Sequence, residues 1–237
     1  MVESLFPLQV RDLTIKRRGK TLLGPLTHDF GGSGLTMVIG PNGAGKTTFL
    51  KALHGIERIT AGSIDWAAPA QDVRARQSYV FQTPTMLRRS VRDNLAYPLQ
   101  LIGAPRGEID AQCALWADRI GLSDAMDRPA PRLSGGERQK LALARALIRK
   151  PDVLFLDEPC ANLDGRATAD IERLLCDARR TGTRIIMTSH NVGQIRRLAT
   201  DFIFLLDGAA HETGPASQLQ EAKTSELNAF LKGEILQ

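Results

Sequence analysis

The stretch Gly40-Pro41-Asn42-Gly43-Ala44-Gly45-Lys46-Thr47 matches the phosphate-binding pattern G-x-x-x-x-G-K-[ST] at every fixed position. It follows the apolar run Leu35 to Ile39 and precedes a stretch of helical character that starts at Lys46. Glycines let consecutive backbone N–H groups turn toward a phosphate, and the N-terminus of the following helix adds positive potential. Lys46 can place a charge near the β- and γ-phosphates, and the Thr47 hydroxyl can bind Mg²⁺. This stretch, with Thr48 directly after it, therefore predicts a site for a nucleoside triphosphate with Mg²⁺.

Two further apolar runs each end in residues that carry chemistry. Val153 to Leu156 is followed by Asp157-Glu158, and Arg184 to Thr188 is followed by Ser189-His190. Short continuous apolar runs are typical of strands buried on both faces of a parallel sheet, whose carboxyl ends bind ligands. We expect Asp157 to hold Mg²⁺ and Glu158, one residue further, to be the general base that activates the attacking water.

The rest of the chain surrounds this sheet with two other kinds of structure. Residues 84–132 are mostly helical, with Pro and Gly punctuation, and Ser90 with Asp93 predicts an N-cap. Residues 2–30 alternate in short pieces between glycine turns, which favours an antiparallel β flap. We predict an α/β fold with a P-loop NTPase core and a mainly parallel sheet. Residues 1–237 form one domain, 84–132 an inserted helical subdomain and 212–237 a short C-terminal tail.

The stretch Leu133-Ser134-Gly135-Gly136-Glu137 begins another helix. Ser134 and Glu137 form the capping-box pattern S-x-x-E, which opens a helix expected to run to about Arg149. A cap does not need two glycines between its partners. The glycines leave the helix N-terminus bare, so that an anion can approach the backbone closely.

These motifs together resemble the nucleotide-binding domain of ABC transporters over nearly the whole chain. The resemblance includes the P-loop, a Q-loop at Gln82, the signature at residues 133–137 and the Walker B run through Glu158. It also includes a D-loop, Ala161-Asn162-Leu163-Asp164, and the switch histidine His190. The resemblance implies an ABC ATPase fold that binds ATP and Mg²⁺ and works as a head-to-tail homodimer.

The resemblance also implies a role for each of these residues. ATP on one P-loop would be closed over by Ser134, Gly135, Gly136 and Glu137 of the other subunit. Gln82 would contact Mg²⁺ and the attacking water, and His190 would hydrogen-bond the γ-phosphate. Asp164 would help to fix the dimer interface. The sequence departs from the family in Arg18, which replaces the usual aromatic residue under the adenine, and a guanidinium can also stack on a base.

Composition narrows the class of protein. The chain has 237 residues and a net charge of +5, but its basic residues fall in short pairs without interleaved aromatic residues, so we expect no nucleic-acid partner. The three cysteines form no CxxC pair, and we interpret them as reduced thiols. The longest aliphatic–aromatic run has five residues, and Met1 to Ser4 do not resemble the start of a signal peptide. We expect a peripheral protein at the cytoplasmic face of the inner membrane.

Three hypotheses about function remain, and we favour the first. Within the family, residues 189–199 and the end Phe230-Leu231-Lys232-Gly233-Glu234 are similar to ATPase subunits of bacterial tungstate-type oxyanion importers. Such a subunit drives transmembrane permease subunits and cooperates with a periplasmic or extracellular solute-binding protein. The alternatives are the ATPase of a lipoprotein- or drug-exporting complex and a soluble ABC ATPase that acts on nucleic acid or ribosomes. The last would need a coiled-coil insertion or a second nucleotide domain.

Overall fold

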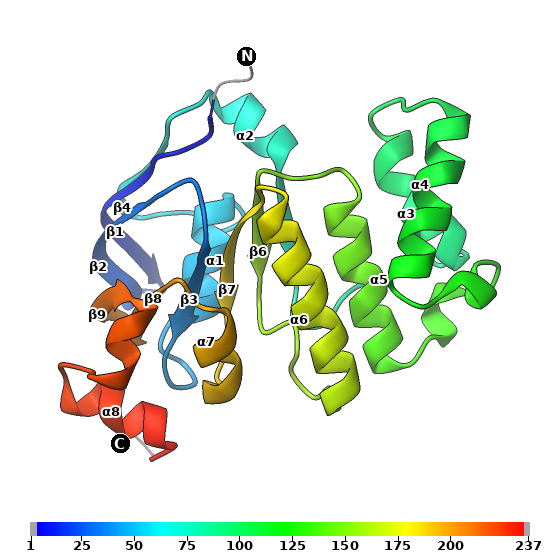
Figure 1. Cartoon of the computed structure of the whole chain (residues 1–237). Helices are drawn as coiled ribbons and strands as arrows, with labels where there is room; N and C mark the ends of the chain where they lie inside the picture. Colours follow the sequence, from blue (N-terminus) through cyan, green and yellow to red (C-terminus); the bar gives the residue numbers. More distant parts are fainter. Residues whose placement is uncertain (1–3, 235–237) are drawn as a thin grey trace.

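The computed structural model describes residues 4–234 and contains a large and a small β-sheet with helices packed around them (Figure 1). The large sheet has six strands in the order β5-β6-β7-β3-β8-β9, in which the first five are parallel and β9 is antiparallel to β8. This arrangement confirms the predicted α/β class with a mainly parallel sheet. The strands are β3 (Leu35–Ile39), β5 (Gln77–Val80), β6 (Val153–Leu156), β7 (Arg184–Thr188), β8 (Asp201–Leu206) and β9 (Ala209–Pro215).

The small sheet is antiparallel, with the strand order β2-β1-β4. β1 (Leu8–Arg17) and β2 (Lys20–Phe30) form the flap expected from residues 2–30, of which residues 2 and 3 lie outside the described part. The third strand, β4 (Ala61–Trp66), comes from beyond the phosphate-binding loop and was not expected. Its residues are half-buried or exposed, so its sequence lacks the apolar alternation that reveals β1.

Eight α-helices lie among the described residues, and none of them has the length and apolar character needed to cross a bilayer. They are α1 (Lys46–His54), α2 (Ala70–Arg76), α3 (Val91–Gln100), α4 (Arg106–Arg119), α5 (Gly135–Leu147), α6 (Gly165–Arg180), α7 (Val192–Leu198) and α8 (Ser225–Lys232). Three short 3₁₀ helices join them: η1 (Ser123–Ala125), η2 (Ala130–Arg132) and η3 (Ala216–Gln220).

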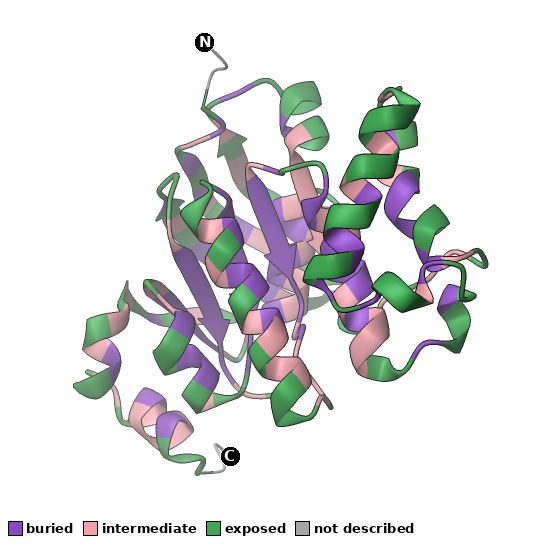
Figure 2. Cartoon of the chain, turned by 45° about the vertical axis from the view of Figure 1, so that its right-hand side comes forward, coloured by how far each residue is buried: buried purple, intermediate pink, exposed green. Residues whose placement is uncertain are grey.

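The central strands of the large sheet, β3, β6, β7 and β8, are among the most buried parts of the molecule (Figure 2). Along β3, Met37 and Ile39 face a core shared with the helices from α3 to α8, whereas Val38 faces a core shared with α1 and the small sheet. Both faces of the sheet are therefore covered, which explains why its strands are continuous apolar runs.

The segment 84–132 contains α3, α4, η1 and η2. The Ser90 hydroxyl accepts the Asp93 N–H at 3.0 Å, which confirms the predicted cap of α3. On α4, Cys113 and Trp116 are buried, and Ile120 is buried directly after the helix ends. These residues are spaced three and four positions apart and form one apolar face, which packs the helical segment onto the core.

The C-terminal segment differs from the expected tail. Residue 212 lies inside β9, where the buried Glu212 carboxylate accepts hydrogen bonds from the backbone of Lys223 and Thr224. α8 then packs on the core through Leu227 and Leu231. A buried carboxylate must be paired, and this requirement ties the end of the chain to the sheet.

A buried arginine joins three neighbouring strands at their amino ends. The side chain of Arg184 on β7 is 2% exposed, and its guanidinium lies 3.1 Å from the Asp201 carboxylate on β8. The same guanidinium donates to the Thr36 hydroxyl on β3 and to the Ser33 carbonyl. Burial alone would raise the pKa of Asp201, but Arg184 and the Thr36 and Thr200 hydroxyls together lower it. The strand that carries the phosphate-binding loop is thus held at its base by an ion pair.

We predict that Arg184→Met lowers the free energy of unfolding by about 3 kcal/mol, because it leaves the Asp201 carboxylate without its counter-charge. Arg180→Met removes the exposed pair with Asp177 and should cost less than about 1 kcal/mol. Because the folded-state pKa of Asp201 is lowered, the pair stabilises above the unfolded pKa of about 3.9, and this contribution disappears as the pH falls through the folded pKa. Urea denaturation at neutral pH and below about pH 4 tests this. Equal losses for the two variants at neutral pH would contradict it.

Candidate functional site

The phosphate-binding loop is a glycine-dependent turn between β3 and α1. Gly40, Gly43 and Gly45 have φ angles of 146°, 84° and 98°, a region that side-chain-bearing residues rarely adopt. A Cβ on Gly40 would lie 2.1 Å from the Leu205 carbonyl oxygen of β8, so this position also needs close backbone approach. A Cβ on Gly43 would meet nothing within 4 Å. Gly40 therefore meets two needs, backbone freedom and space, whereas Gly43 meets the need for backbone freedom alone.

Lys46, the first residue of α1, is held inside this turn. Its ammonium donates to the carbonyl oxygens of Gly40 at 2.8 Å and Pro41 at 2.9 Å. Burial lowers the pKa of Lys46, while the nearby Glu158 and Asp157 carboxylates raise it. The charge is thus positioned at the mouth of the loop, where it can exchange carbonyl partners for an anion.

Asp157, which follows β6, is linked to the start of α1 and to the end of β7. It is buried, and its Oδ1 accepts from the Thr47 hydroxyl at 2.9 Å and the Thr188 hydroxyl at 3.0 Å. Thr188, the last residue of β7, also accepts the Glu158 N–H at 2.8 Å. We did not single out Thr188 from the sequence. The signal for it was a hydroxyl residue at the end of a strand that neighbours an acidic pair.

Glu158 lies at the centre of the candidate catalytic side chains. Its Oε2 is 3.3 Å from Nδ1 of His190 and 3.4 Å from Nε2 of Gln82. The backbone of Glu158 has φ 45°, a left-handed conformation that a non-glycine residue adopts only under constraint. The fold therefore brings together three residues that are far apart in the sequence, and two of them are directed at the carboxylate of the third.

The donor set beside the loop fits Mg²⁺. Thr47 supplies a hydroxyl and Asp157 a carboxylate, and these two groups are already 2.9 Å apart. Gln82, whose amide nitrogen is 3.4 Å from the Glu158 carboxylate, carries a further amide oxygen. Mg²⁺ prefers such oxygen ligands, and it is usually held by one or two protein groups plus substrate phosphates.

Ser134 caps α5 as predicted. Its hydroxyl accepts the Glu137 N–H at 3.3 Å, and the Glu137 carboxylate accepts the Ser134 N–H at 2.7 Å, which completes the capping box. Burial alone would raise the pKa of Glu137, but Ser134 and the paired Arg128 lower it. α5 ends at Leu147, two residues before the expected end. Around Gly135 there is open space, so its backbone is accessible.

The signature residues lie beside the D-loop rather than beside the P-loop. Ser134, Gly135, Asn162 and Asp164 line one groove of about 730 Å³. Asp164 caps α6 by accepting the Ala167 N–H at 2.7 Å, so its carboxylate already has a local structural role. α5 packs next to β5, which is separated from β3 by β6 and β7, and three strand spacings amount to about 14 Å. Gly135 also lines a second groove together with Gln82, so the signature residues of one chain adjoin Gln82 and the D-loop.

Arg18 occupies the position at which the sequence departs from the family, and Cys160 follows Glu158 and Pro159. Arg18 lies in the exposed turn between β1 and β2 with φ 51°, and β2 continues into Leu22 and Leu23, which lie against Gly45. The turn that carries Arg18 is therefore close to the phosphate-binding loop. Cys160 packs against the core, and burial raises its pKa to about 11, so it is a protonated thiol rather than a reactive thiolate.

Comparisons with known proteins give the family of this chain. A family described as ABC transporter matches residues 23–161, more than half of the chain. The tungstate uptake system ATP-binding protein TupC of Peptoclostridium acidaminophilum is 36% identical over 86% of this chain and 97% of its own length. The sn-glycerol-3-phosphate import ATP-binding protein UgpC of Paracoccus denitrificans is 31% identical over 94% of this chain, which spans 65% of that protein. The structure of cbiO1 from Clostridium perfringens, part of the ABC transporter complex cbiONQ, superposes with a TM-score of 0.81 at 25% identity, covering 92% of each chain.

We predict that Gly40→Ala destabilises the protein far more than Gly43→Ala, although both glycines have positive φ. Gly43→Ala should cost about 1–2 kcal/mol for the backbone conformation alone. Gly40→Ala adds the clash with the Leu205 carbonyl and should cost about 3 kcal/mol or more. Chemical denaturation without nucleotide measures both free energies of unfolding. Similar losses of stability for the two variants would show that Gly40 does not approach the Leu205 carbonyl of β8 as closely as described.

Proposed function

Because the chain belongs to the ABC transporter family, as an ATP-binding subunit of the import type, we propose that it drives the import of tungstate or a related oxyanion. It is an ATPase, and the energy of ATP hydrolysis is passed to separate permease subunits. The observation that carries the catalytic assignment is the convergence of Gln82 and His190 on the Glu158 carboxylate, next to the Thr47–Asp157 pair.

We propose that the triphosphate lies in the turn of residues 40–48. The backbone N–H groups of this turn and the start of α1 cradle the β-phosphate. Lys46 releases the Gly40 and Pro41 carbonyls and donates to phosphate oxygens instead. Because the ammonium is already desolvated, it loses little solvation when the anion arrives. Arg18 stacks on the adenine in place of an aromatic ring.

Thr47 and Asp157 would hold the Mg²⁺, with Gln82 as a third oxygen donor. When bound, the ion supplies charge neutralisation for the β- and γ-phosphate oxygens. Thr188 keeps the Asp157 carboxylate oriented through its own hydrogen bond, whether or not a nucleotide is present.

Glu158 accepts a proton from the water that attacks the γ-phosphorus. As the new P–O bond forms, the bond to the β–γ bridging oxygen breaks, and ADP and phosphate are the products. His190 hydrogen-bonds the γ-phosphate and fixes the Glu158 carboxylate, from which it is 3.3 Å away. Gln82, which is also next to the Glu158 carboxylate, contacts the attacking water and Mg²⁺ and responds to the membrane partner. A positioned base of this kind contributes about 10²–10⁴-fold to the rate.

We propose that the complete site needs two copies of the chain. The signature residues 134–137 lie at the start of α5, which packs beside β5, three strand positions away from the P-loop strand β3 of their own chain, and Gly135 is open to solvent. In a head-to-tail homodimer, Ser134, Gly135, Gly136 and Glu137 of one subunit close over the γ-phosphate bound by the other. Asp164, beside them in the same groove, helps to fix this interface.

The partners follow from the same proposal. The helical subdomain 84–132 contacts transmembrane permease subunits, and the protein is held as a peripheral subunit at the cytoplasmic face of the inner membrane. A periplasmic or extracellular solute-binding protein delivers the oxyanion to the permease. The similarity to TupC over nearly the full length of that protein supports tungstate, and the subunit itself does not touch the transported ion.

We predict that Glu158→Gln binds ATP with an unchanged dissociation constant but loses turnover by about 10²-fold or more, because the amide keeps the shape and cannot accept the proton. Glu221→Gln, an exposed change of the same type in the C-terminal segment, should leave both values unchanged. Equilibrium nucleotide binding and phosphate release measure the two effects. Near-normal phosphate release from Glu158→Gln would refute the assignment of the base.

The same pair of variants tests the substrate in cells that lack the endogenous gene. Expression of the wild type or Glu221→Gln should restore tungsten accumulation measured by mass spectrometry, whereas Glu158→Gln should not. Molybdate and phosphate uptake measured in parallel identify the oxyanion. Restored uptake of another solute with unchanged tungsten would overturn the tungstate proposal and leave the ATPase assignment intact.

We predict that two inactive variants complement each other in a mixed dimer. Lys46→Ala disables both P-loop halves of a homodimer, and Gly135→Asp disables both signature halves by placing a carboxylate where the γ-phosphate must lie. A heterodimer separated by two affinity tags has one pocket with both defects and one with neither. It should recover hydrolysis, or at least ATP-dependent dimerisation if two working pockets are required for turnover.

The matched control is Gly107→Asp, another open glycine in the first turn of a helix, which should remain active as a homodimer. Failure of the Lys46→Ala and Gly135→Asp pair to regain either hydrolysis or dimerisation would rule out the shared site.

A further inference from the structure

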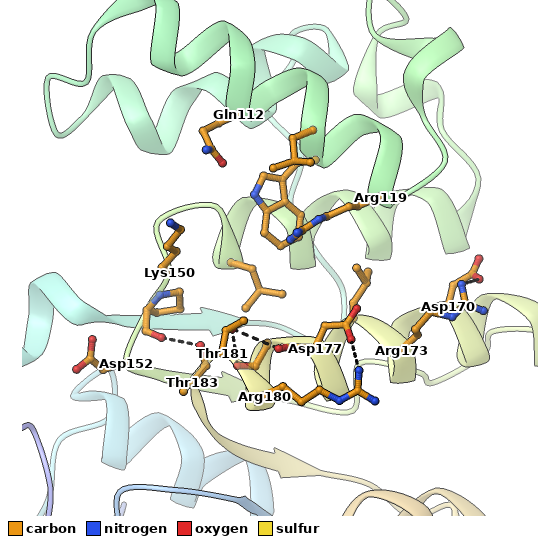
Figure 3. A pocket seen from close by; sticks show the side chains of 17 residues that line it. Gln112, Arg119, Lys150, Asp152, Asp170, Arg173, Asp177, Arg180, Thr181 and Thr183 are labelled. Carbon is orange, nitrogen blue, oxygen red and sulfur yellow. Dashed lines mark hydrogen bonds and ion pairs between the residues drawn. The ribbon is translucent and has the colours of Figure 1, made fainter.

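A cavity away from the candidate catalytic groups lies between α4, α6 and the loop that follows α5. Its volume is about 940 Å³, at the upper end of the range for sites of small organic ligands. Figure 3 shows Gln112 and Arg119 reaching into it from α4, Lys150 from the loop after α5, and Asp177 and Arg180 from α6. The cavity therefore lies at the seam between the helical segment 84–132 and the sheet core.

The floor of the cavity is apolar. Trp116 and Leu147 are almost fully buried there, and they are joined by Pro151, Leu174 and Ala178. Leu115 stands at the rim with 43% of its surface exposed, one of the few large apolar side chains exposed on this protein. A ligand that fills the space must therefore offer an apolar or aromatic body to this floor.

The carboxylates of the cavity wall are already neutralised. Asp177 pairs with Arg180 at 2.9 Å, and Asp170 pairs with Arg173 at 3.5 Å and with Lys140 at 3.3 Å. Asp152 pairs with Arg76, which lies outside the wall.

Two cations of the wall have no such partner. Across residues 4–234, neither Arg119 nor Lys150 forms an ion pair with a carboxylate. The Arg119 guanidinium instead lies over the Trp116 ring, 5.2 Å from its centre. Lys150 is exposed and is fixed at the end of α5 by a left-handed backbone turn with φ 52°. Figure 3 shows the two cations on opposite sides of the hollow.

We propose that this cavity binds a small organic anion, with an aromatic or apolar body against Trp116 and its anionic group within reach of Arg119 or Lys150. The charges select against a neutral apolar ligand, and the apolar floor selects against a bare inorganic anion. The Trp116 indole holds the Arg119 guanidinium, and no carboxylate competes with an incoming anion for this charge. The site is distinct from the nucleotide pocket, which is built from the loop after β3.

The probe for this site is 8-anilinonaphthalene-1-sulfonate, an aromatic anion whose emission is sensitised by a nearby tryptophan. The chain has two tryptophans, so Trp66→Phe leaves Trp116 as the only donor. We expect saturable binding of one probe molecule with sensitised emission, which is lost on the further change Trp116→Phe. Arg119→Gln with Lys150→Gln should weaken binding by about tenfold or more, the effect of losing one charge-assisted contact.

The control variant Arg196→Gln with Lys232→Gln removes one arginine and one lysine outside the cavity wall, and it should bind the probe as the wild type does. N-phenyl-1-naphthylamine, the same ring system without the sulfonate, should bind more weakly and respond little to the cavity variants. Equal affinity for both probes, or equal effects of the two double variants, would overturn the proposal. Displacement of the probe by MgATP would also overturn it, because the signal would then come from the nucleotide pocket.

Discussion

A carboxylate that is removed from water must receive hydrogen bonds, and in this protein the buried Asp157 receives two from different elements. The Thr47 hydroxyl comes from the first turn of α1, which follows β3 and the phosphate-binding loop, and the Thr188 hydroxyl comes from the end of β7. Satisfying one acidic group thus fixes the relative positions of the ends of β6 and β7 and the start of α1. Glu158 follows in the chain and inherits this position, and the Thr188 hydroxyl also accepts its N–H.

Much of this arrangement could be predicted because the residues involved directly follow recognisable apolar runs in the sequence. Continuous apolar runs predict the strands β3, β6 and β7, and the chemistry follows each run directly. The Ser134 cap could be predicted because its hydrogen bonds span three residues. The fold class, the helical segment and the cap are local statements of this kind, and the structure agrees with them.

The remaining features depend on contacts between distant segments, which leave little trace in the sequence. The Arg184 side chain joins residues from β3, β7 and β8, and although Arg184 begins a run predicted to be a buried strand, nothing near it in the sequence indicates these partners. β4 was missed because it is stabilised by pairing with β1 and not by an apolar pattern of its own. The expected C-terminal tail began too early for a similar reason, since Glu212 is fixed by backbone groups eleven and twelve residues later.

The left-handed backbone of Glu158 has a consequence for how such a protein changes over generations. A glycine at this position would relieve about 1–2 kcal/mol of conformational strain, and asparagine or aspartate would relieve part of it. Replacing Glu158 by such a residue therefore increases stability, whereas keeping the glutamate benefits only function. Once a copy of the gene is no longer needed for hydrolysis, this position should be among the first to drift, and the drift should produce a sturdier protein that is catalytically idle.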